Sequence, residues 1–145
     1  MTDDLINWDS FSETRELLGA QFVRILGYFR EDGMKSVAAI EEAMRVGNSG
    51  ALVMPAHTLK GESFQFGAEK LGEIAEQLEV AARHFVEIQQ GPEELLSLVV
   101  QLRPIFETTL SALEQEFSPL IERRATMSAR NMNGITAFGR SSSSY

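Results

Sequence analysis

Residues 71–88 read LGEIAEQLEVAARHFVEI, and this stretch carries the longest regular apolar stripe of the chain. Its apolar positions recur every three or four residues, which places side chains on one face of an α-helix. These positions are Leu71, Ile74, Leu78, Ala81, Phe85 and Ile88. The spacing predicts one long amphipathic helix that turns its apolar face toward a core.

The same helical spacing extends to both sides of that stretch. Upstream, apolar residues recur between residues 18 and 44 with an interruption at Gly33, and a further helix is expected over about 51–66. Downstream, the sequence QGP at 90–92 marks a stop, and a last helix follows over 95–117. Short breaks between long amphipathic helices favour antiparallel neighbours. The sequence therefore predicts an all-α fold, an up-and-down four-helix bundle with an additional N-terminal helix.

The composition limits the class of protein. The chain has 145 residues, no cysteine and a net charge of −8. A single domain is expected, and a disulfide scaffold, thiolate metal sites and a cysteine nucleophile are excluded. An acidic chain repels phosphate backbones, which argues against nucleic-acid binding. The acidic N-terminus does not look like a signal peptide, and no apolar run approaches the ~18 residues of a membrane span, so we expect a soluble, cytoplasmic protein.

Charge and composition divide the chain into three parts. Residues 1–7 are expected to form a flexible N-terminus, and residues 8–117 the helical bundle. Residues 118–145 contain four arginines and one glutamate, which gives them a charge of +3 and leaves −11 on residues 1–117. This last segment lacks a helical apolar rhythm and cannot bury enough surface to offset its ordering entropy. It is expected to be a disordered tail, which either orders on a partner or has no role.

The segment most informative about function is residues 54–67, MPAHTLKGESFQFG. With about 100° of rotation per residue, a helix through this segment has two distinct sides. The core side consists of Leu52, Leu59, Ser63 and Phe66. The opposite side gathers four residues within roughly 60° of one another, and these are His57, Lys60, Gly61 and Phe64. The histidine is therefore expected to point toward solvent.

Three members of the solvent-facing side combine useful chemical properties. The imidazole of His57 is a neutral nucleophile near pH 7, and the ammonium of Lys60 can balance phosphoryl oxygens. Gly61 costs its helix about 1 kcal/mol relative to alanine, while the missing side chain lets another molecule approach closely. An ordinary surface histidine and a solvated lysine would explain the first two residues, but they would not explain the glycine.

A set of residues at fixed spacing resembles the histidine-containing phosphotransfer (HPt) domain family: HTLKG at 57–61, then Gly67, Leu71, Leu78 and Glu79. The resemblance covers residues 8–117. It implies a four-helix bundle that carries a phosphoryl group on a histidine. It also implies that His57 is the phosphoacceptor, that Lys60 supports the phosphoryl group and that Gly61 gives the partner access.

The resemblance also implies the partners. The phosphoryl group is received from a histidine kinase or a receiver-domain aspartate and passed to a response-regulator receiver domain. The chain is expected to act as a monomer, without nucleic acid or membrane. It needs no cofactor of its own, and Mg²⁺ is expected in the partner receiver domain. Because no nucleotide-binding motif is present, the chain is expected to be a phosphocarrier without autonomous kinase activity.

Four residues near the histidine are expected to dock the receiver: Val53, Met54, Phe64 and Gln65. Phe64 stands where the family often has a small or polar residue. It is either an apolar contact for the receiver or a side chain folded back onto Val53 or Met54. Pro55 lies about one turn into the helix, where it is expected to kink the helix or to free a carbonyl.

Other candidate sites have weaker support. His84 has no lysine and glycine companion and is expected to be an ordinary surface or boundary histidine. Glu73, Glu76 and Glu79 are expected to form a solvated face. No metal site is expected, because the chain lacks the inward Glu-x-x-His pairs of di-metal bundles. Two alternatives stay open: an HPt-like module that binds receivers without carrying phosphate, and a helical bundle that binds a metal or small ligand.

Overall fold

The computed structural model describes residues 5–131, and the side chains of residues 5–116. In chain order its helices are α2 (Trp8–Leu18), η1 (Gly19–Gln21), α3 (Phe22–Val46), α4 (Ser49–Gln65), α5 (Glu69–Glu87), η2 (Glu93–Leu95) and α6 (Leu96–Asn131). The two elements labelled η are single turns of 3-10 helix. No strand occurs among the residues described, and the predicted all-α class is confirmed.

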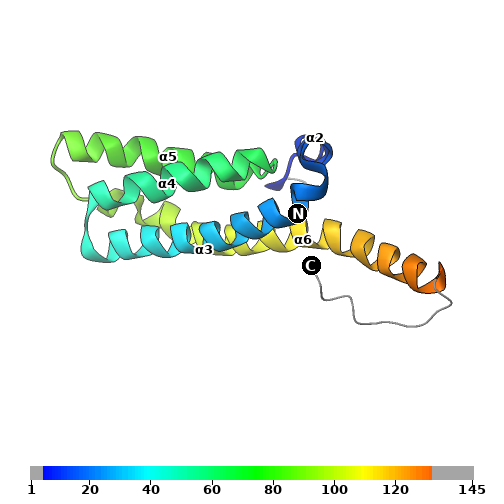
Figure 1. Cartoon of the computed structure of the whole chain (residues 1–145). Coiled ribbons are helices and arrows are strands. Elements are labelled where there is room, and N and C mark those ends of the chain that lie inside the picture. The colour runs from blue at the N-terminus through cyan, green and yellow to red at the C-terminus, as the bar shows by residue number, and fades with distance from the viewer. Residues whose placement is uncertain (1–4, 132–145) are drawn as a thin grey trace. The chain divides into compact units, whose positions relative to one another are not determined.

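The chain divides into two compact units, residues 1–109 and residues 110–145. In the first unit, α3, α4, α5 and the first part of α6 run side by side, and α2 lies at the end where α3 begins (Figure 1). Two residues separate α3 from α4, and three separate α4 from α5. Connections this short make neighbouring helices antiparallel. The predicted four-helix bundle with an additional N-terminal helix is therefore confirmed.

Local caps set where α4 begins and ends. Gly47 ends α3 in the left-handed conformation with φ 71°. The side chain of Asn48 then begins α4 by accepting a hydrogen bond from the N–H of Ala51 at 3.1 Å. After α4, Gly67 has φ 75°, a conformation that other residues rarely adopt. Residues 49–65 therefore form one helix between two short connections, each of which contains a glycine with positive φ.

The apolar stripe of α5 faces the core as predicted, except at its last member. Its buried residues are Leu71, Ile74, Leu78 and Phe85. Ala81 is half-buried, and Ile88 is exposed because it follows the end of α5. A chain of phenylalanine rings with centroids 5.4 to 5.9 Å apart extends the core, and it consists of Phe11, Phe22, Phe66, Phe29 and Phe106.

The sequence suggested that Gly33 interrupts its helix, and this prediction was wrong. Helix α3 continues through it, and Gly33 is buried. A Cβ atom at this position would overlap the ring of Phe106 from α6. The glycine therefore allows the ring to lie directly against the backbone of α3.

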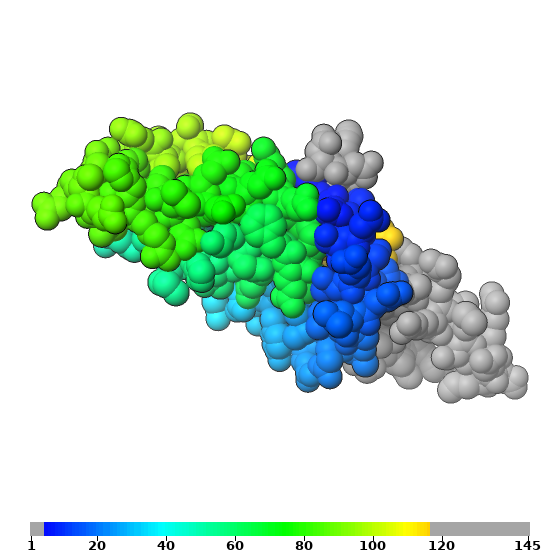
Figure 2. Space-filling model, turned by 90° about the horizontal axis from the view of Figure 1, so that it is seen from above, coloured from blue at the N-terminus to red at the C-terminus, as the bar shows by residue number. Residues whose placement is uncertain are grey.

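The N-terminal boundary differs from the prediction. Ile6 is buried, and the N–H of Asn7 donates to the carbonyl of Gly67 at 2.7 Å. The space-filling view shows the blue N-terminal residues packed against the green residues around the α4–α5 connection (Figure 2). Residues 5–7 therefore belong to the fold and are not part of a flexible N-terminus, because an apolar side chain and a backbone hydrogen bond hold them there.

The C-terminal boundary also differs. Helix α6 does not end at residue 117 but continues to Asn131. Residues 118–131, expected to begin a disordered tail, are therefore helical. This stretch contains leucine, glutamate, arginine and alanine, which favour helix without any apolar rhythm. The rest of the expected tail, residues 132–145, lies outside the described residues.

Candidate functional site

Helix α4 presents the two sides that the sequence predicted. The side turned into the bundle carries the buried residues Leu52, Ala56, Leu59 and Ser63. On the other side, His57 keeps 51% of its side chain exposed, and Gly61 is exposed one turn later. The helical period and the cap at Asn48 thus direct the imidazole toward solvent.

Pro55 does not break the helix that carries the histidine. Helix α4 runs continuously from Ser49 to Gln65 with the proline inside it. Because proline has no N–H, the carbonyl of Ala51 four residues earlier loses its helical partner. Ala51 is exposed, so solvent can satisfy this carbonyl. The proline frees a carbonyl, as expected, and leaves His57 on the solvent side.

The side chain that organises this surface comes from α5. Glu79 is only 5% exposed, and its carboxylate reaches the histidine on α4. Its Oε2 atom lies 3.0 Å from Nδ1 of His57, and its Oε1 atom lies 2.9 Å from Nζ of Lys60. Within α5, Nη2 of Arg83 donates to Oε2 at 2.7 Å. One carboxylate therefore holds the histidine and two cations.

These contacts keep Glu79 ionised at neutral pH. Burial alone would raise its pKa, but hydrogen bonds from its three partners outweigh burial and lower the pKa of Glu79 to about 2. An ionised carboxylate can only accept hydrogen bonds, so Nδ1 of His57 carries the proton between the two groups. In the neutral imidazole the lone pair is then on Nε2.

The surroundings of His57 suit an anionic group. One carboxylate and two cations lie next to the imidazole, so the cluster has one positive charge in excess. A Cβ atom placed on Gly61 would meet no atom within 4 Å. The arrangement therefore offers a nucleophilic nitrogen, cations for an anion and room for a second molecule.

The described side chains form no metal-binding cluster. Within residues 5–116, no group of three or more histidine, aspartate or glutamate residues could hold a metal ion. In the described part of the chain, no helix is both long enough and apolar enough to cross a membrane.

Comparison with known proteins shows the family. The family model of the Hpt domain matches residues 24–118, which is more than half of the chain. The chain belongs to the Hpt domain family. A solved structure with the same fold is the crystal structure of histidine-containing phosphotransfer protein B (HptB) from Pseudomonas aeruginosa PAO1. It has a TM-score of 0.67 and 23% sequence identity, and the match covers 77% of this chain and 93% of that chain. No curated protein matches.

As an Hpt domain, the chain is a histidine phosphotransfer module of the phosphorelay type. This class of module is a phosphocarrier and not a kinase. The structure brings together the three residues that the sequence singled out for this chemistry, His57, Lys60 and Gly61, on one side of α4.

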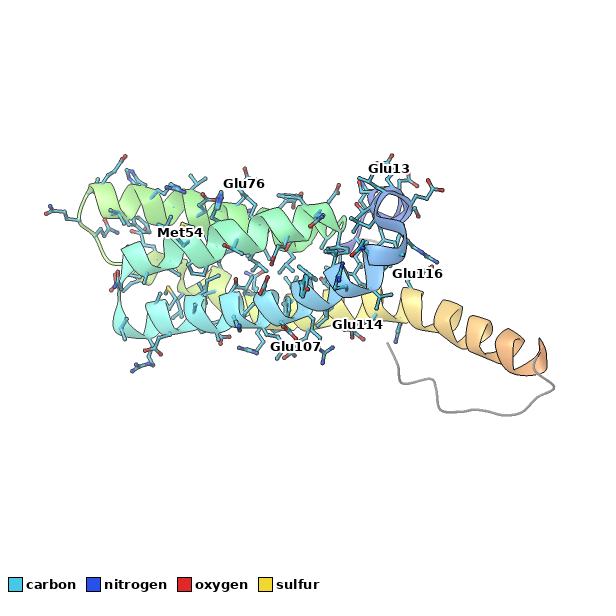
Figure 3. The ribbon with its side chains drawn as sticks, in the orientation of Figure 1. Glu13, Met54, Glu76, Glu107, Glu114 and Glu116 are labelled. Atoms are coloured by element: carbon cyan, nitrogen blue, oxygen red, sulfur yellow. The ribbon has the colours of Figure 1, made fainter. Side chains whose placement is uncertain are left out.

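The prediction for Glu79 of this Hpt domain was wrong. It was expected on a solvated face with Glu73 and Glu76, and only those two are exposed; Figure 3 shows Glu76 on the outer side of α5. Glu79 can be buried because its Oε2 atom is hydrogen-bonded to His57 and Arg83 and its Oε1 atom forms an ion pair with Lys60. Two signals pointed to it: its place directly after the core residue Leu78, and Arg83 four residues later on the same helix face.

The second histidine of the Hpt domain, His84, lies outside the cluster that contains His57. His84 is exposed on α5, and its ring centroid lies 6.0 Å from that of Phe85. It takes no part in the cluster around Glu79. This position agrees with an ordinary surface histidine.

The four residues expected to dock the receiver are not equally placed. Met54, on α4 in Figure 3, is exposed one turn before the histidine, and Gln65 is exposed at the end of α4. Val53 is half-buried. Phe64 is 41% exposed, but its ring lies against Gly72 of α5. The ring therefore packs across to α5 and does not fold back along α4.

Proposed function

We propose that this Hpt domain carries a phosphoryl group on Nε2 of His57. It accepts the group from a histidine kinase or a receiver-domain aspartate and passes it to a response-regulator receiver domain. The observation that supports this most directly is the contact between Glu79 and Nδ1, because it leaves the lone pair on the other ring nitrogen. The open position at Gly61 gives the partner's reacting group room to reach that nitrogen.

The transfer exchanges one bond for another. The Nε2 lone pair attacks the phosphorus of an aspartyl phosphate, the P–O bond breaks, and the aspartate leaves as a carboxylate. The phosphorylated ring keeps its proton on Nδ1 and becomes positive, and the carboxylate of Glu79 at 3.0 Å offsets that charge. In the onward step a receiver carboxylate attacks phosphorus, the P–N bond breaks, and His57 is released as neutral imidazole.

Two cations are proposed to hold the phosphoryl oxygens. Lys60 and Arg83 bind the same carboxylate as the imidazole, and charge-assisted hydrogen bonds to phosphoryl oxygens are strong. Glu79 already holds both nitrogens, at 2.9 and 2.7 Å, so they are in place before the phosphoryl group arrives. We place the Mg²⁺ of the transfer in the receiver domain and no cofactor in this chain.

The proposed docking surface surrounds the histidine and consists of Val53, Met54, Phe64 and Gln65. Methionine and aromatic side chains are enriched at protein interfaces, and both types are exposed here. The chain is proposed to dock as a monomer, with neither nucleic acid nor membrane taking part.

Incubation with a phosphorylated receiver domain tests the proposal. Acid-labile phosphate is expected on one histidine, and ¹H–¹⁵N correlation spectra should locate it on Nε2. His57→Gln should abolish the label, while the matched control His84→Gln should keep it. Phosphate that persists in His57→Gln, or that is bound to Nδ1, would overturn the proposal. Receiver binding without any phosphate would identify an interaction module instead.

Lys60→Ala should slow the transfer without eliminating it. The ammonium balances charge but forms no bond to phosphorus, so one charge-assisted contact worth about 1.5–3 kcal/mol is lost. This corresponds to a rate lower by roughly 10- to 150-fold. Rapid-quench measurement of phosphoryl transfer checks the value, with Lys70→Ala, an exposed lysine of α5, as the matched control. Equal rates in Lys60→Ala and wild type would show a lysine that is merely solvated.

A further inference from the structure

Phe64 and Gly72 make a contact between α4 and α5 that the transfer step itself does not use. A Cβ atom on Gly72 would lie 2.7 Å from Cζ, 2.8 Å from Cε1 and 2.9 Å from Cε2 of the Phe64 ring. Nearly equal distances to three adjacent ring atoms mean that the ring presents its face to Gly72. The ring therefore occupies the space that any side chain at residue 72 would need.

The backbone of α5 does not explain the glycine. Gly72 is a buried residue inside α5 and has no positive φ. A glycine inside a helix costs about 1 kcal/mol relative to alanine. The three nearest atoms that a Cβ would meet all belong to the Phe64 ring. The absence of a side chain at Gly72 thus leaves the space that the Phe64 ring occupies.

The space over Gly61 is open to a ring displaced from Gly72. Long side chains in a helix point back over the turn that precedes them. For Phe64 this turn contains Lys60 and Gly61. A Cβ position on Gly61 has no atom within 4 Å, so the space there is free. A ring that leaves Gly72 can therefore cover the gap beside the histidine.

We propose that Gly72 seats the Phe64 ring against α5 and thereby keeps the surface over Gly61 open for the partner that reaches His57. This inference rests on the proposed phosphotransfer and adds to it the means by which the receiver gains access. Gly72 is a positioning residue, because it acts only through the ring. Two glycines on different helices then serve the same access route, since Gly61 leaves space for the partner and Gly72 holds the nearest aromatic side chain away from that space.

The seating can be measured without a partner. In the wild-type protein, nuclear Overhauser effects are expected between the ring protons of Phe64 and the α-protons of Gly72. These α-protons should also be shifted upfield, because they lie over the face of the ring. Phe64→Leu should remove the upfield shift. A folded wild-type protein without these Overhauser effects would overturn the inference.

The consequence for transfer can be measured with a phosphorylated receiver domain. Gly72→Ala should keep the bundle folded, because the overlap falls on a half-exposed ring that can move. The transfer rate should nevertheless fall by about tenfold, because a ring that lies over Gly61 hinders the partner's reacting group from reaching its position beside His57. Gly27→Ala is the matched control, because a Cβ at this exposed position of α3 meets nothing within 4 Å. It should transfer at the wild-type rate.

Removal of the ring separates this positioning role from a general structural one. In a Phe64→Ala background, Gly72→Ala should cause no further loss of rate, because no ring remains to be displaced. Additive losses would overturn the inference, and so would a wild-type rate in Gly72→Ala. If the wild-type protein accepts no phosphate, the proposed function fails instead, while the Overhauser effects still decide whether the ring is seated.

Discussion

At the scale of single residues, Glu79 links the site to the stability of the fold. A buried carboxylate is unfavourable unless charges and hydrogen bonds compensate for the lost water. Here the imidazole of His57 and two cations compensate, and in turn the carboxylate orients the imidazole. Glu79 therefore has two roles: it orients the imidazole of His57, and its ionised form stabilises the folded state.

Acid titration should reveal this link. The pKa of Glu79 is about 2 in the folded state against an ordinary value of 4.5, so its contribution to stability is present above about pH 4.5 and is lost as the pH falls toward 2. Urea denaturation at stepped pH should show a smaller loss of stability over this interval in Glu79→Gln than in wild type. The control is Glu73→Gln, an exposed carboxylate of the same helix. Identical acid sensitivity in Glu79→Gln and wild type would contradict the prediction.

Gly61 should matter for access and not for folding. Gly61→Gln improves helix propensity by several tenths of a kcal/mol, so the melting temperature should hold or rise slightly. The new side chain has free space around it but occupies the approach to the histidine, so the transfer rate should fall sharply. Thermal melts and transfer assays on the same sample measure both effects. A wild-type transfer rate would show that close approach at this position is not required.

At the scale of helices, two carboxyl groups lie together between α3 and α4, those of Asp32 and Glu62. Burial, followed by a hydrogen bond and the charge of Asp32 on α3, raises the pKa of Glu62 on α4 to about 7. The Oε1 atom of Glu62 is buried without a hydrogen-bond partner. Near neutral pH the folded protein therefore favours the protonated form of Glu62 more than an exposed glutamate would.

The α3–α4 pair should make stability fall with rising pH. The folded-state pKa of Glu62 lies above its ordinary value of 4.5, so the folded protein binds more protons, and stability decreases as the pH rises from about 4.5 to about 7. Glu62→Gln should reduce this slope in thermal melts over that range. Glu31→Gln, an exposed carboxylate of α3, should keep it. A slope that is unchanged in Glu62→Gln would show that this carboxyl is not the source.

At the scale of the whole molecule, the boundary given by charge and burial does not coincide with the end of a helix. Helix α6 runs to Asn131, yet the last buried side chain among residues 5–116 is Leu113. Residues 118–145 carry +3 and the preceding residues −11. Folding of the bundle and the charge of the C-terminal segment are therefore expected to be separable.

Deletion of residues 118–145 should leave the bundle folded. The melting temperature of the shortened chain should stay within about 4 °C of the full chain, which corresponds to less than about 1 kcal/mol. At low salt the two chains should differ more than at high salt, because the deletion removes opposite charge from an acidic domain. Circular dichroism melts at two salt concentrations measure this. A large drop in melting temperature at both salt concentrations would show that the segment contributes to the packed structure.

The order of the bundle helices and the side of α4 that carries the chemistry could be predicted from the sequence, whereas the continuation of α3 through Gly33 and of α6 to Asn131 could not. Both predictable features depend on interactions between residues close in the chain: the apolar period, the cap at Asn48 and the glycine that ends α3. The cluster of His57, Lys60 and Gly61 could be predicted for the same reason, since it lies within two turns of one helix.

Which side chains complete that cluster depends on how the helices pack against one another. Glu79 lies 22 residues from the histidine, and Gly72 meets Phe64 across two helices. Helical periodicity defines the faces of a helix, but the rotation and stagger of one helix against another come from packing. A shift of one turn between α4 and α5 would leave the apolar pattern satisfied and would separate the carboxylate from the imidazole. The nucleophile could therefore be predicted from the sequence, whereas its orientation and its access required the packed bundle.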